Sequence, residues 1–326
     1  MLNGKVILIT GGTGSFGKKF TEIVLKRYKP KKLIIFSRDE MKQHQMSKQF
    51  NPKKYDSLRY FIGDVRDKDR LHRAFSGVDI VIHAAALKIV PTAEYNPFEA
   101  VKTNVFGAEN VINTAIDNNV KKVIVLSTDK AANPINLYGA TKLCAEKMFI
   151  AANNYSPYGT KFSVVRYGNV LGSRGSVLPF FRECKKKKVL PVTDERMTRF
   201  WVTLKDGAEF VISSIEQMKG GEVFVPKLAS MKIVDLAKAI APKCKLKIIG
   251  IRPGEKLHET LVSSDDARHT IEEKDRFIIY PEVVFSDRKK IEGNYLTESF
   301  EGYRSDNNSK WLTVSDLKRI VKQEEQ

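Results

Sequence analysis

Two neighbouring motifs carry side chains that can move protons. Thr128, Asp129 and Lys130 follow the apolar run KVIVLS, and Tyr138 and Lys142 come soon after them. Tyr138 and Lys142 are four residues apart, so on a helix they lie on one face, one turn apart. We expect the Lys142 ammonium to hold the pKa of Tyr138 down towards the working pH, which makes the phenol a usable base for a sugar hydroxyl.

A glycine-rich loop near the amino terminus predicts dinucleotide binding. The apolar run at 6–9 is followed by TGGTGSFG and then by a segment with helical spacing at 18–27. Glycines in such a loop allow a tight turn, close approach of the backbone to a pyrophosphate, and packing of the helix on the strand. The amino end of the helix offers N–H groups to the phosphates. The expected contacts are Gly11, Thr13, Gly14, Ser15, Phe16 and Gly17.

The end of the second apolar run favours NADP over NAD. The run at 31–36 ends at Ser37 and Arg38, where NAD-binding chains usually carry an acidic residue. A hydroxyl and a guanidinium, with Lys42 one helical turn beyond, suit a 2′-phosphate. Asp39 follows directly and remains a candidate acceptor for a free ribose diol, so NAD stays open.

The elements that must position these motifs are apolar runs of strand length separated by helical stretches. This alternation predicts an α/β fold with a doubly wound parallel sheet covered on both faces. Ligands bind at the carboxyl ends of such strands, so Asp64, Val65 and Ala84 are further cofactor candidates. His83, also at a strand end, is expected to be structural. The runs are 5–10, 32–37, 58–62, 79–84, 121–127 and 161–166.

The pattern changes after about residue 168, where strands become short and dispersed. We predict a Rossmann domain over 1–168, to which some later segments return, and a smaller substrate-binding domain over 169–326. Near the C-terminus, Thr313 and Asp316 occupy N-cap positions ahead of an amphipathic helix.

Composition indicates a soluble globular protein. The chain has 326 residues, of which 42% are hydrophobic and 29% charged, and it is long enough to bury a large core. No apolar run has the length to cross a bilayer, and no leader precedes the first strand, so we expect a cytoplasmic protein without a membrane partner. The three cysteines are odd in number and widely spaced, which predicts reduced thiols and no metal site.

A formal net charge of +18 raises the question of nucleic-acid binding. The lysines are scattered, and the densest run, at 185–188, contains no aromatic residue. No helix-turn-helix, zinc-finger or RNA-recognition signature accompanies it. We therefore expect no nucleic-acid partner. A basic surface would equally attract a small polyanionic substrate, and a lysine-rich solvated face is the simplest account.

Taken together, the motifs resemble the extended short-chain dehydrogenase/reductase family and, within it, the inverting UDP-N-acetylglucosamine 4,6-dehydratases. Retaining nucleotide-sugar 4,6-dehydratases usually carry an Asp-Glu pair after the threonine, whereas here Lys130 replaces the glutamate. A related capsule-type group tends to have methionine where this chain has Tyr138, so Tyr138 points to the pseudaminate branch. The resemblance covers about residues 4–260 and rests on TGGTGSFG, SRDE, GDVRD, HAAALK, STDKAANPINLYGATK, RYGNVLGSRGS, MTRFW and IRPGEKLHE.

The resemblance implies a redox-neutral reaction with a retained NADP. Tyr138, assisted by Lys142, would take the proton of the sugar's 4-hydroxyl while carbon 4 is oxidised, and Thr128 would hydrogen-bond the oxygen on carbon 4. Lys130 would remove the carbon-5 proton, and Asp129 or protonated Lys130 would help to expel the 6-hydroxyl. Lys130 must be neutral to act as a base. Burial and nearby cations would lower its pKa and Asp129 would raise it, so the sequence leaves this balance open.

The resemblance also implies the substrate-binding residues. Arg252 and Glu255, three apart on a turn, would hold the diphosphate and ribose of UDP. Asn104 would order the edge of the cofactor site. A homo-oligomer, such as a hexamer, is implied as well. The implied contacts of UDP-N-acetylglucosamine are Lys88, Lys130, Asn169, Leu178, Thr193, Arg252 and Glu255, with Arg199 as a further candidate.

Two other functions remain open on the sequence. A nucleotide-sugar 4-epimerase would share the cofactor loop and the Tyr-Lys pair, but it needs no acid–base pair at carbon 5, so Asp129 and Lys130 favour dehydration. A regulator that binds NADP without turnover is expected to lose Tyr138 or Lys142, and this chain keeps both.

Overall fold

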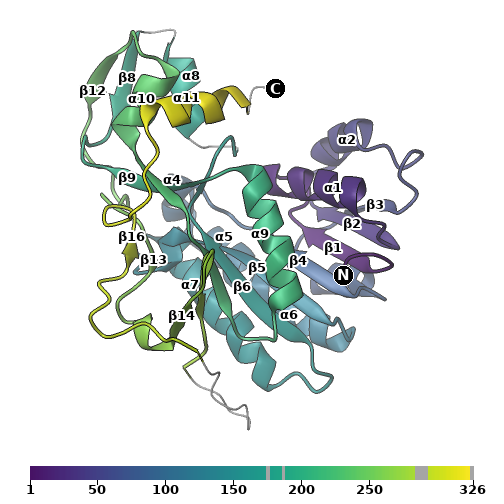
Figure 1. Ribbon diagram of the computed structural model, residues 1–326. Helices are drawn as coiled ribbons and strands as arrows, with labels where there is room; N and C mark the ends of the chain where they lie inside the picture. Colours follow the sequence, from purple (N-terminus) through teal and green to yellow (C-terminus); the bar gives the residue numbers. More distant parts are fainter. Residues whose placement is uncertain (174–176, 186–187, 283–292, 324–326) are drawn as a thin grey trace.

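The fold is built on a nine-stranded sheet (Figure 1). The computed structural model describes residues 1–173, 177–185, 188–282 and 293–323, so the last three residues of the RYGNVLGSRGS motif and part of the 185–188 lysine run lie outside it. In sheet order the strands are β14 (Thr270–Glu272), β15 (Arg276–Ile279), β10 (Val223–Pro226), β6 (Lys161–Tyr167), β5 (Lys122–Thr128), β4 (Ile80–His83), β1 (Val6–Thr10), β2 (Lys32–Ser37) and β3 (Leu58–Ile62).

The strands from β10 to β3 are parallel, and β15 and β14 continue the sheet in antiparallel pairing. The six predicted apolar runs are the strands β1 to β6, within one or two residues at each end. The predicted doubly wound parallel sheet is therefore confirmed. Strands β10, β14 and β15 come from beyond residue 168, so the carboxyl half of the chain supplies one side of the sheet.

Helices cover both faces of the sheet. Residues of α1, α2 and α9 pack with strand side chains in one apolar core, and residues of α3, α6 and α7 pack in the other. The strand side chains alternate between the two cores, as the two faces of a sheet require. These helices are α1 (Ser15–Arg27), α2 (Glu40–Gln49), α3 (Lys68–Phe75), α6 (Gly107–Asp117), α7 (Leu137–Ala151) and α9 (Leu204–Gln217).

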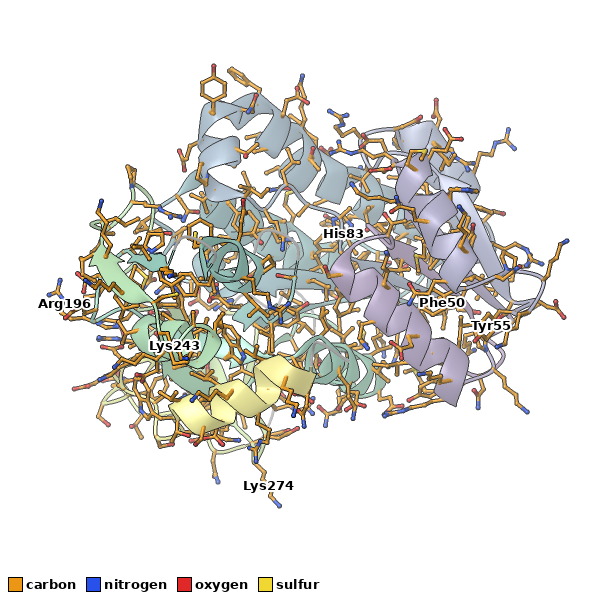
Figure 2. All side chains as sticks on the ribbon, turned by 90° about the horizontal axis from the view of Figure 1, so that it is seen from above. Phe50, Tyr55, His83, Arg196, Lys243 and Lys274 are labelled. Carbon is orange, nitrogen blue, oxygen red and sulfur yellow. The ribbon has the colours of Figure 1, made fainter. Side chains whose placement is uncertain are left out.

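A third apolar core lies in the carboxyl half, beyond one end of the sheet (Figure 1). Figure 2 shows Arg196 and Lys243 of this region on the opposite side of the molecule from Phe50 and Tyr55, with His83 between them. The elements of this region are β7 (Asn169–Val170), α8 (Val177–Lys185), β8 (Val189–Val192), β9 (Thr198–Val202), β11 (Ala229–Lys232), α10 (Ile233–Ile240), β12 (Lys245–Ile248) and α11 (Val314–Gln323).

The predicted C-terminal helix is α11. Its start is a reciprocal cap, because Asp316 N–H donates to Thr313 Oγ1 at 3.2 Å and Thr313 N–H donates to Asp316 Oδ2 at 3.1 Å. Residues 324–326 of the predicted helix lie outside the described residues. The remaining helices and strands are α4 (Val90–Tyr95), α5 (Pro97–Val101), the π-helical turn Lys102–Phe106, β13 (Thr260–Val262) and β16 (Tyr303–Arg304), with short 3₁₀ turns at Asp129–Ala131, Ala152–Asn154 and Ala267–His269.

The order of the strands places a crevice at the carboxyl ends of β1 and β4. The chain moves outward from β1 through β2 to β3 and then returns to β4 on the other side of β1. Loops leaving β1 and β4 therefore diverge, and ligands of such sheets bind at this point. Within the described parts of the chain, no helix is both long and apolar enough to span a bilayer.

Candidate active site

The crevice opens into a cavity of about 760 Å³. A second cavity of about 540 Å³ adjoins it and shares Asn169, Arg252 and Glu255 with it. The first cavity brings together the predicted catalytic residues Thr128, Asp129 and Lys130 with nearly all the predicted cofactor residues. Those that line it are Gly11, Thr13, Gly14, Ser15, Phe16, Gly17, Ser37, Arg38, Asp39, Lys42, Asp64, Val65, Ala84, Tyr138 and Lys142.

The glycine loop forms a backbone cradle at one end of this cavity. Gly11 has φ +64°, and a Cβ there would lie 2.9 Å from the backbone of Ala85. A Cβ on Gly17 would lie 2.2 Å from the carbonyl oxygen of Gly12, so the first turn of α1 packs directly on the loop. Gly14 is the N-cap of α1 and provides no side-chain cap. An uncapped helix terminus above a glycine cradle fits the pyrophosphate of a dinucleotide.

The end of β2 provides a cationic corner in the same cavity. The Arg38 side chain is 56% exposed, and its guanidinium lies 3.7 Å from Asp64 Oδ2. Asp39 caps α2, since its carboxylate accepts the backbone N–H of Lys42 at 2.9 Å and forms an ion pair with the Lys42 ammonium. The Asp39 carboxylate is thus bound to the first turn of α2, whereas Arg38 lines the cavity.

The proton-moving residues sit where β5 ends and the chain enters a 3₁₀ turn. The Thr128 hydroxyl donates to Asp129 Oδ1 at 2.9 Å, and Lys130 Nζ donates to the same oxygen at 3.0 Å. Gly139, in the first turn of α7, packs against this turn so closely that a Cβ would lie 2.1 Å from the Lys130 carbonyl oxygen. This packing places the start of α7, with Tyr138, beside Lys130.

Burial dominates the protonation of Tyr138 and Lys142. It raises the pKa of Tyr138 to about 12, against the opposing effects of the Lys130 charge and a hydrogen bond with Thr128. It lowers the pKa of Lys142 to about 8, against the opposing charge of Glu146. The expectation that Lys142 holds the pKa of Tyr138 down is therefore not met, because burial outweighs the charge and the hydrogen bond that lower that pKa.

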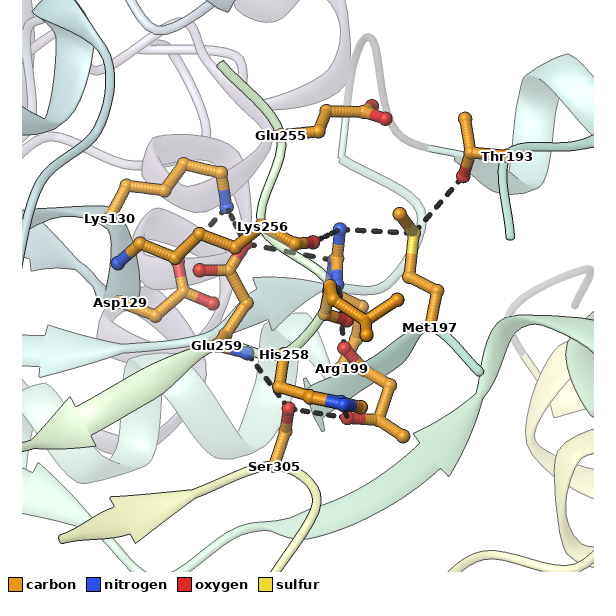
Figure 3. A network of polar contacts seen from close by, with 12 residues as sticks. Asp129, Lys130, Thr193, Met197, Arg199, Glu255, Lys256, His258, Glu259 and Ser305 are labelled. Atoms are coloured by element: carbon orange, nitrogen blue, oxygen red, sulfur yellow. Dashed lines mark hydrogen bonds and ion pairs between the residues drawn. The ribbon is translucent and has the colours of Figure 1, made fainter. Parts of the chain in front are cut away.

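A residue missed by the sequence analysis completes the surroundings of Lys130. Lys130 Nζ lies 3.2 Å from Glu259 Oε1, and Glu259 is 2% exposed (Figure 3). Burial lowers the pKa of Lys130, but the charges of Asp129 and Glu259 outweigh burial and raise it above its ordinary value. The lysine is thus a cation in this arrangement and not the neutral base that the mechanism requires. Glu259 is the last residue of the IRPGEKLHE motif, and its membership of that motif is the sequence feature that could have pointed to it.

The turn that carries Arg252 and Glu255 is fixed against the start of α7. Arg252 Nη1 lies 3.8 Å from Glu255 Oε1, and both residues line both cavities. Gly254, at φ +75°, accepts a hydrogen bond from Asn136 Nδ2 at 2.8 Å. The Lys256 ammonium donates to the Ala132 carbonyl oxygen at 2.6 Å. The predicted nucleotide-binding turn is therefore tied to the catalytic segment at two points.

Two predicted substrate residues present polar atoms to the cavities. Asn169 Oδ1 and Glu255 Oε2 are buried and have no hydrogen-bond partner among the described residues, which suits them to bind a ligand. Lys88 donates to Ser173 Oγ at 3.4 Å, and burial together with the charge of Lys130 lowers its pKa. Thr193 lines the second cavity.

Three other predicted residues lie behind the cavities or bond mainly to the protein itself. Leu178 is 1% exposed, belongs to the third core and lines neither cavity, because its side chain points inward from α8. Asn104 lies behind the cofactor residues, where its amide group bonds both backbone groups of Leu87 and the hydroxyl of Thr141. Arg199 lines the second cavity, but its guanidinium donates to backbone carbonyls, including those of Lys256 and Leu257.

The fold and the cavity define the class of protein. A doubly wound sheet with a glycine cradle after β1 and a Tyr-x-x-x-Lys pair on α7 is the architecture of an extended short-chain dehydrogenase/reductase. The chain belongs to the polysaccharide biosynthesis protein family, whose model matches residues 7–281.

The chain is also similar to individual named proteins and solved structures. A Campylobacter jejuni protein named UDP-N-acetylglucosamine 4,6-dehydratase (inverting) is 55% identical over 98% of both chains. A Rickettsia conorii protein named UDP-glucose 4-epimerase is 43% identical over 98% of this chain and 96% of its own. Among solved structures, Pen from Bacillus thuringiensis has a TM-score of 0.87 and 38% identity, with 99% of both chains covered. The dTDP-glucose 4,6-dehydratase DesIV of Streptomyces venezuelae, solved with NAD bound, shares the fold at a TM-score of 0.68 and 21% identity over 77% of this chain and 86% of its own.

Proposed function

We propose that this protein is a UDP-N-acetylglucosamine 4,6-dehydratase that inverts carbon 5. The observation that carries the proposal is the contact of Lys130 with Asp129 at the end of β5, directly beside Tyr138 and the Arg252 turn. A 4-epimerase needs a base at the 4-hydroxyl only, whereas elimination of water also needs an acid and a base near carbons 5 and 6. The 55% identity to the Campylobacter dehydratase supports the same activity.

We assign the proton transfers to the residues of this cavity. Tyr138 takes the proton of the 4-hydroxyl, and Thr128 hydrogen-bonds the oxygen on carbon 4. A bound NADP would accept a hydride from carbon 4 and return it to carbon 6, so the reaction needs no outside oxidant. Lys130, in its neutral form, removes the proton at carbon 5, and Asp129 or the protonated Lys130 protonates the departing 6-hydroxyl, after which carbon 5 is reprotonated from the opposite face. The product is UDP-2-acetamido-2,6-dideoxy-β-L-arabino-hex-4-ulose.

We infer that the nucleotide of the substrate occupies the second cavity. Arg252 would pair with the diphosphate and Glu255 would accept the ribose hydroxyls. The buried, unpartnered oxygens of Asn169 and Glu255 support this placement. Thr193 and Lys88 would contribute further contacts, the latter near the sugar, because Lys88 lines the first cavity with Lys130.

We infer NADP as the cofactor. Arg38 and Lys42 offer positive charge beside the cavity, and Ser37 offers a hydroxyl. Asp39, the carboxylate that directly follows Arg38, is engaged as the cap of α2, which weakens it as an acceptor for a free ribose diol.

We further propose that the product enters pseudaminic acid, for flagellar or surface glycans, as the resemblance of the Tyr138 motif implies. Self-association, as a hexamer or a smaller homo-oligomer, is proposed on the same ground. Tyr95, Phe98 and Phe106 are 88%, 77% and 53% exposed on α4, α5 and the π-helical turn, and they offer an apolar surface for it. Light scattering of the purified protein gives the number of chains.

The activity is tested by proton NMR of the purified protein with UDP-N-acetylglucosamine in deuterated water, without added NADP. We expect a new 6-methyl signal, deuterium at carbon 5 and an L-arabino ring. A D-xylo ring would retain dehydration but remove the role of Lys130 in inversion. Formation of UDP-N-acetylgalactosamine would identify a 4-epimerase instead. No reaction, with NADP bound, would favour a regulator.

A further inference from the structure

Glu259 makes a contact with the catalytic lysine that none of the assigned roles uses. Lys130 Nζ lies between two carboxylates, 3.0 Å from Asp129 Oδ1 and 3.2 Å from Glu259 Oε1. The lysine side chain is 24% exposed, whereas Asp129 is 1% and Glu259 is 2% exposed. The amine can therefore meet a substrate, but Glu259 reaches the cavity only through the amine. Figure 3 shows Lys130 and Glu259 facing each other across the site.

The backbone of Glu259 is held in place by a hydrogen-bond network. Its N–H donates to Ser305 Oγ at 2.9 Å, and the N–H of Ser305 donates to its carbonyl oxygen at 2.8 Å. Ser305 Oγ also lies 2.7 Å from Thr198 Oγ1. The carboxylate thus extends from a fixed stretch of backbone next to β13.

The carboxylate of Glu259 is costly to bury, which argues for a role. One oxygen, Oε2, is buried without a hydrogen-bond partner among the described residues. A buried carboxylate that is only partly satisfied destabilises a fold, and such groups are concentrated at functional sites. Arg199 Nε lies 3.7 Å from Oε1 and offsets part of that cost.

We propose that Glu259 is a positioning residue for dehydration, which holds the Lys130 amine opposite Asp129 and controls the pH at which that amine gives up its proton. The proposal deepens the proposed function and rests on it. Removing the negative charge of Glu259 leaves Asp129 as the one carboxylate in contact with Lys130 in the described structure, so the amine should lose its proton at lower pH.

The charges around the pair fix the direction of this effect. Asp129 faces Lys130 from the same turn, Arg199 from β9, Lys256 from the segment before β13, Lys88 from the loop after β4 and Tyr138 from α7. Burial raises the pKa of the Glu259 carboxyl, but the neighbouring cations outweigh burial and lower it. Burial and the charge of Glu259 raise the pKa of Asp129. Of the two carboxyl groups, Glu259 is therefore the one whose ionised form its surroundings favour more.

The test compares Glu259→Gln, which removes the charge and keeps the shape, with Glu259→Asp, which keeps the charge farther from Lys130. Glu222→Gln is the matched control, because Glu222 is 3% exposed and accepts a hydrogen bond from Ser163 at 2.7 Å, but lies at the amino ends of the parallel strands, whereas Lys130 follows the carboxyl end of β5. All variants are assayed as the full chain.

The first readout is independent of turnover. The protein is exposed to trace acetic anhydride at pH 8, and acetylation of Lys130 relative to the exposed Lys238 is measured by peptide mass spectrometry. Only the neutral amine reacts, so Glu259→Gln should raise the relative rate at least tenfold, with Glu259→Asp intermediate and Glu222→Gln unchanged. An unchanged rate in Glu259→Gln overturns the proposal, and so does an equal rise in Glu222→Gln.

The second readout is the pH profile of dehydration. The limb of the profile that depends on Lys130 should move to lower pH in Glu259→Gln by roughly one to three units, whether the lysine acts as the base or as the acid. A profile that falls in height without moving indicates a merely structural role and overturns the proposal. If Glu259→Gln does not fold, the intermediate labelling rate of Glu259→Asp carries the test, and a wild-type rate there overturns it. If the wild-type protein dehydrates no sugar but the labelling rates differ as stated, the proposed function fails and the coupling of Glu259 to Lys130 stands.

Discussion

Asn136 and Gly254 are joined by a hydrogen bond of 2.8 Å from the side-chain amide to the carbonyl oxygen. The same asparagine caps α7, since its Oδ1 accepts the N–H of Gly139 at 2.8 Å. One side chain therefore fixes both the start of the helix that carries Tyr138 and the turn that carries Arg252 and Glu255. The proposed catalytic segment and the proposed nucleotide-binding turn therefore meet at Asn136, in addition to the hydrogen bond between Lys256 and Ala132.

Replacing Asn136 with alanine should loosen the nucleotide turn. We expect KM for UDP-N-acetylglucosamine to rise more than kcat falls, and the free energy of unfolding to drop by about 1–2 kcal/mol through loss of the cap. Thr313→Ala is the control, because Thr313 caps α11 by accepting the N–H of Asp316 at 3.2 Å and lines neither cavity. Steady-state kinetics and thermal melts check this. Equal KM values in the two variants would contradict it.

Lys130→Ala should abolish dehydration and leave UDP binding nearly intact. Loss of a proton-transfer group lowers the rate by roughly 10²–10⁴-fold. Because Asp129 and Glu259 would then face each other without the ammonium, the melting temperature should also fall. NMR of the reaction and calorimetric titration with UDP measure the two effects separately. Normal turnover in this variant would refute the catalytic role.

Gly17 and Gly207 form a matched pair of helical glycines. A Cβ at Gly17 in α1 would lie 2.2 Å from a backbone oxygen, whereas at Gly207 in α9 the nearest atom is 3.9 Å away. Gly17→Ala should therefore lose bound dinucleotide and destabilise the fold by about 1–3 kcal/mol. Gly207→Ala should be neutral or more stable by up to about 1 kcal/mol. Absorbance of the released cofactor and thermal melts distinguish them, and intact cofactor in Gly17→Ala would speak against the cradle.

Arg38→Ala should weaken NADP and spare NAD. A charge-assisted bond to a 2′-phosphate is worth about 1.5–3 kcal/mol, so the Kd for NADP should rise about 10–100-fold. Arg59→Ala, at an exposed position of β3, is the control and should change neither Kd. Fluorescence titration with each dinucleotide provides the values. An equal loss of affinity for NAD would show that Arg38 does not read the 2′-phosphate.

Lys142 should make stability depend on pH in a definite direction. Burial lowers its pKa to about 8 in the folded protein, below the ordinary 10.5. The folded state therefore bears a buried charge below pH 8, and this cost disappears as the pH rises from 8 towards 10.5. Lys142→Met should melt higher than wild type at pH 7, and the gap should narrow by pH 10. Lys147→Met, at an exposed position of α7, should show a constant gap. A constant gap for Lys142→Met would contradict the burial argument.

The sequence predicted the sheet well because strands buried on both faces read as apolar runs, as in β2 and β5. It also placed Asp129 and Lys130 correctly in the crevice, because residues that follow adjacent parallel strands must meet at one edge. It could not predict the protonation of Tyr138, which depends on how much water the whole fold removes from α7.

Two features of the site depend on arrangements that the sequence does not show. Leu178 lies on the inward side of α8, while its neighbours Val177 and Phe181 line the second cavity. Which residues of α8 reach the cavity thus depends on how the helix is turned against the rest of the protein. The contact of Glu259 with Lys130 joins segments that are far apart in the chain. The motif that contains Glu259 therefore does not indicate which residue it contacts.

Because both halves of the chain contribute strands to the sheet, one edge of the sheet stays unpaired while the protein is being synthesised. Strand β6 ends at Tyr167, but its neighbour β10 begins only at Val223, and β15 covers β10 only after Arg276. While the ribosome translates the intervening residues, the hydrogen-bonding edge of β6 is open to other chains. We expect nascent chains that stop before β10 to need a chaperone, and a truncated protein ending near residue 168 to aggregate.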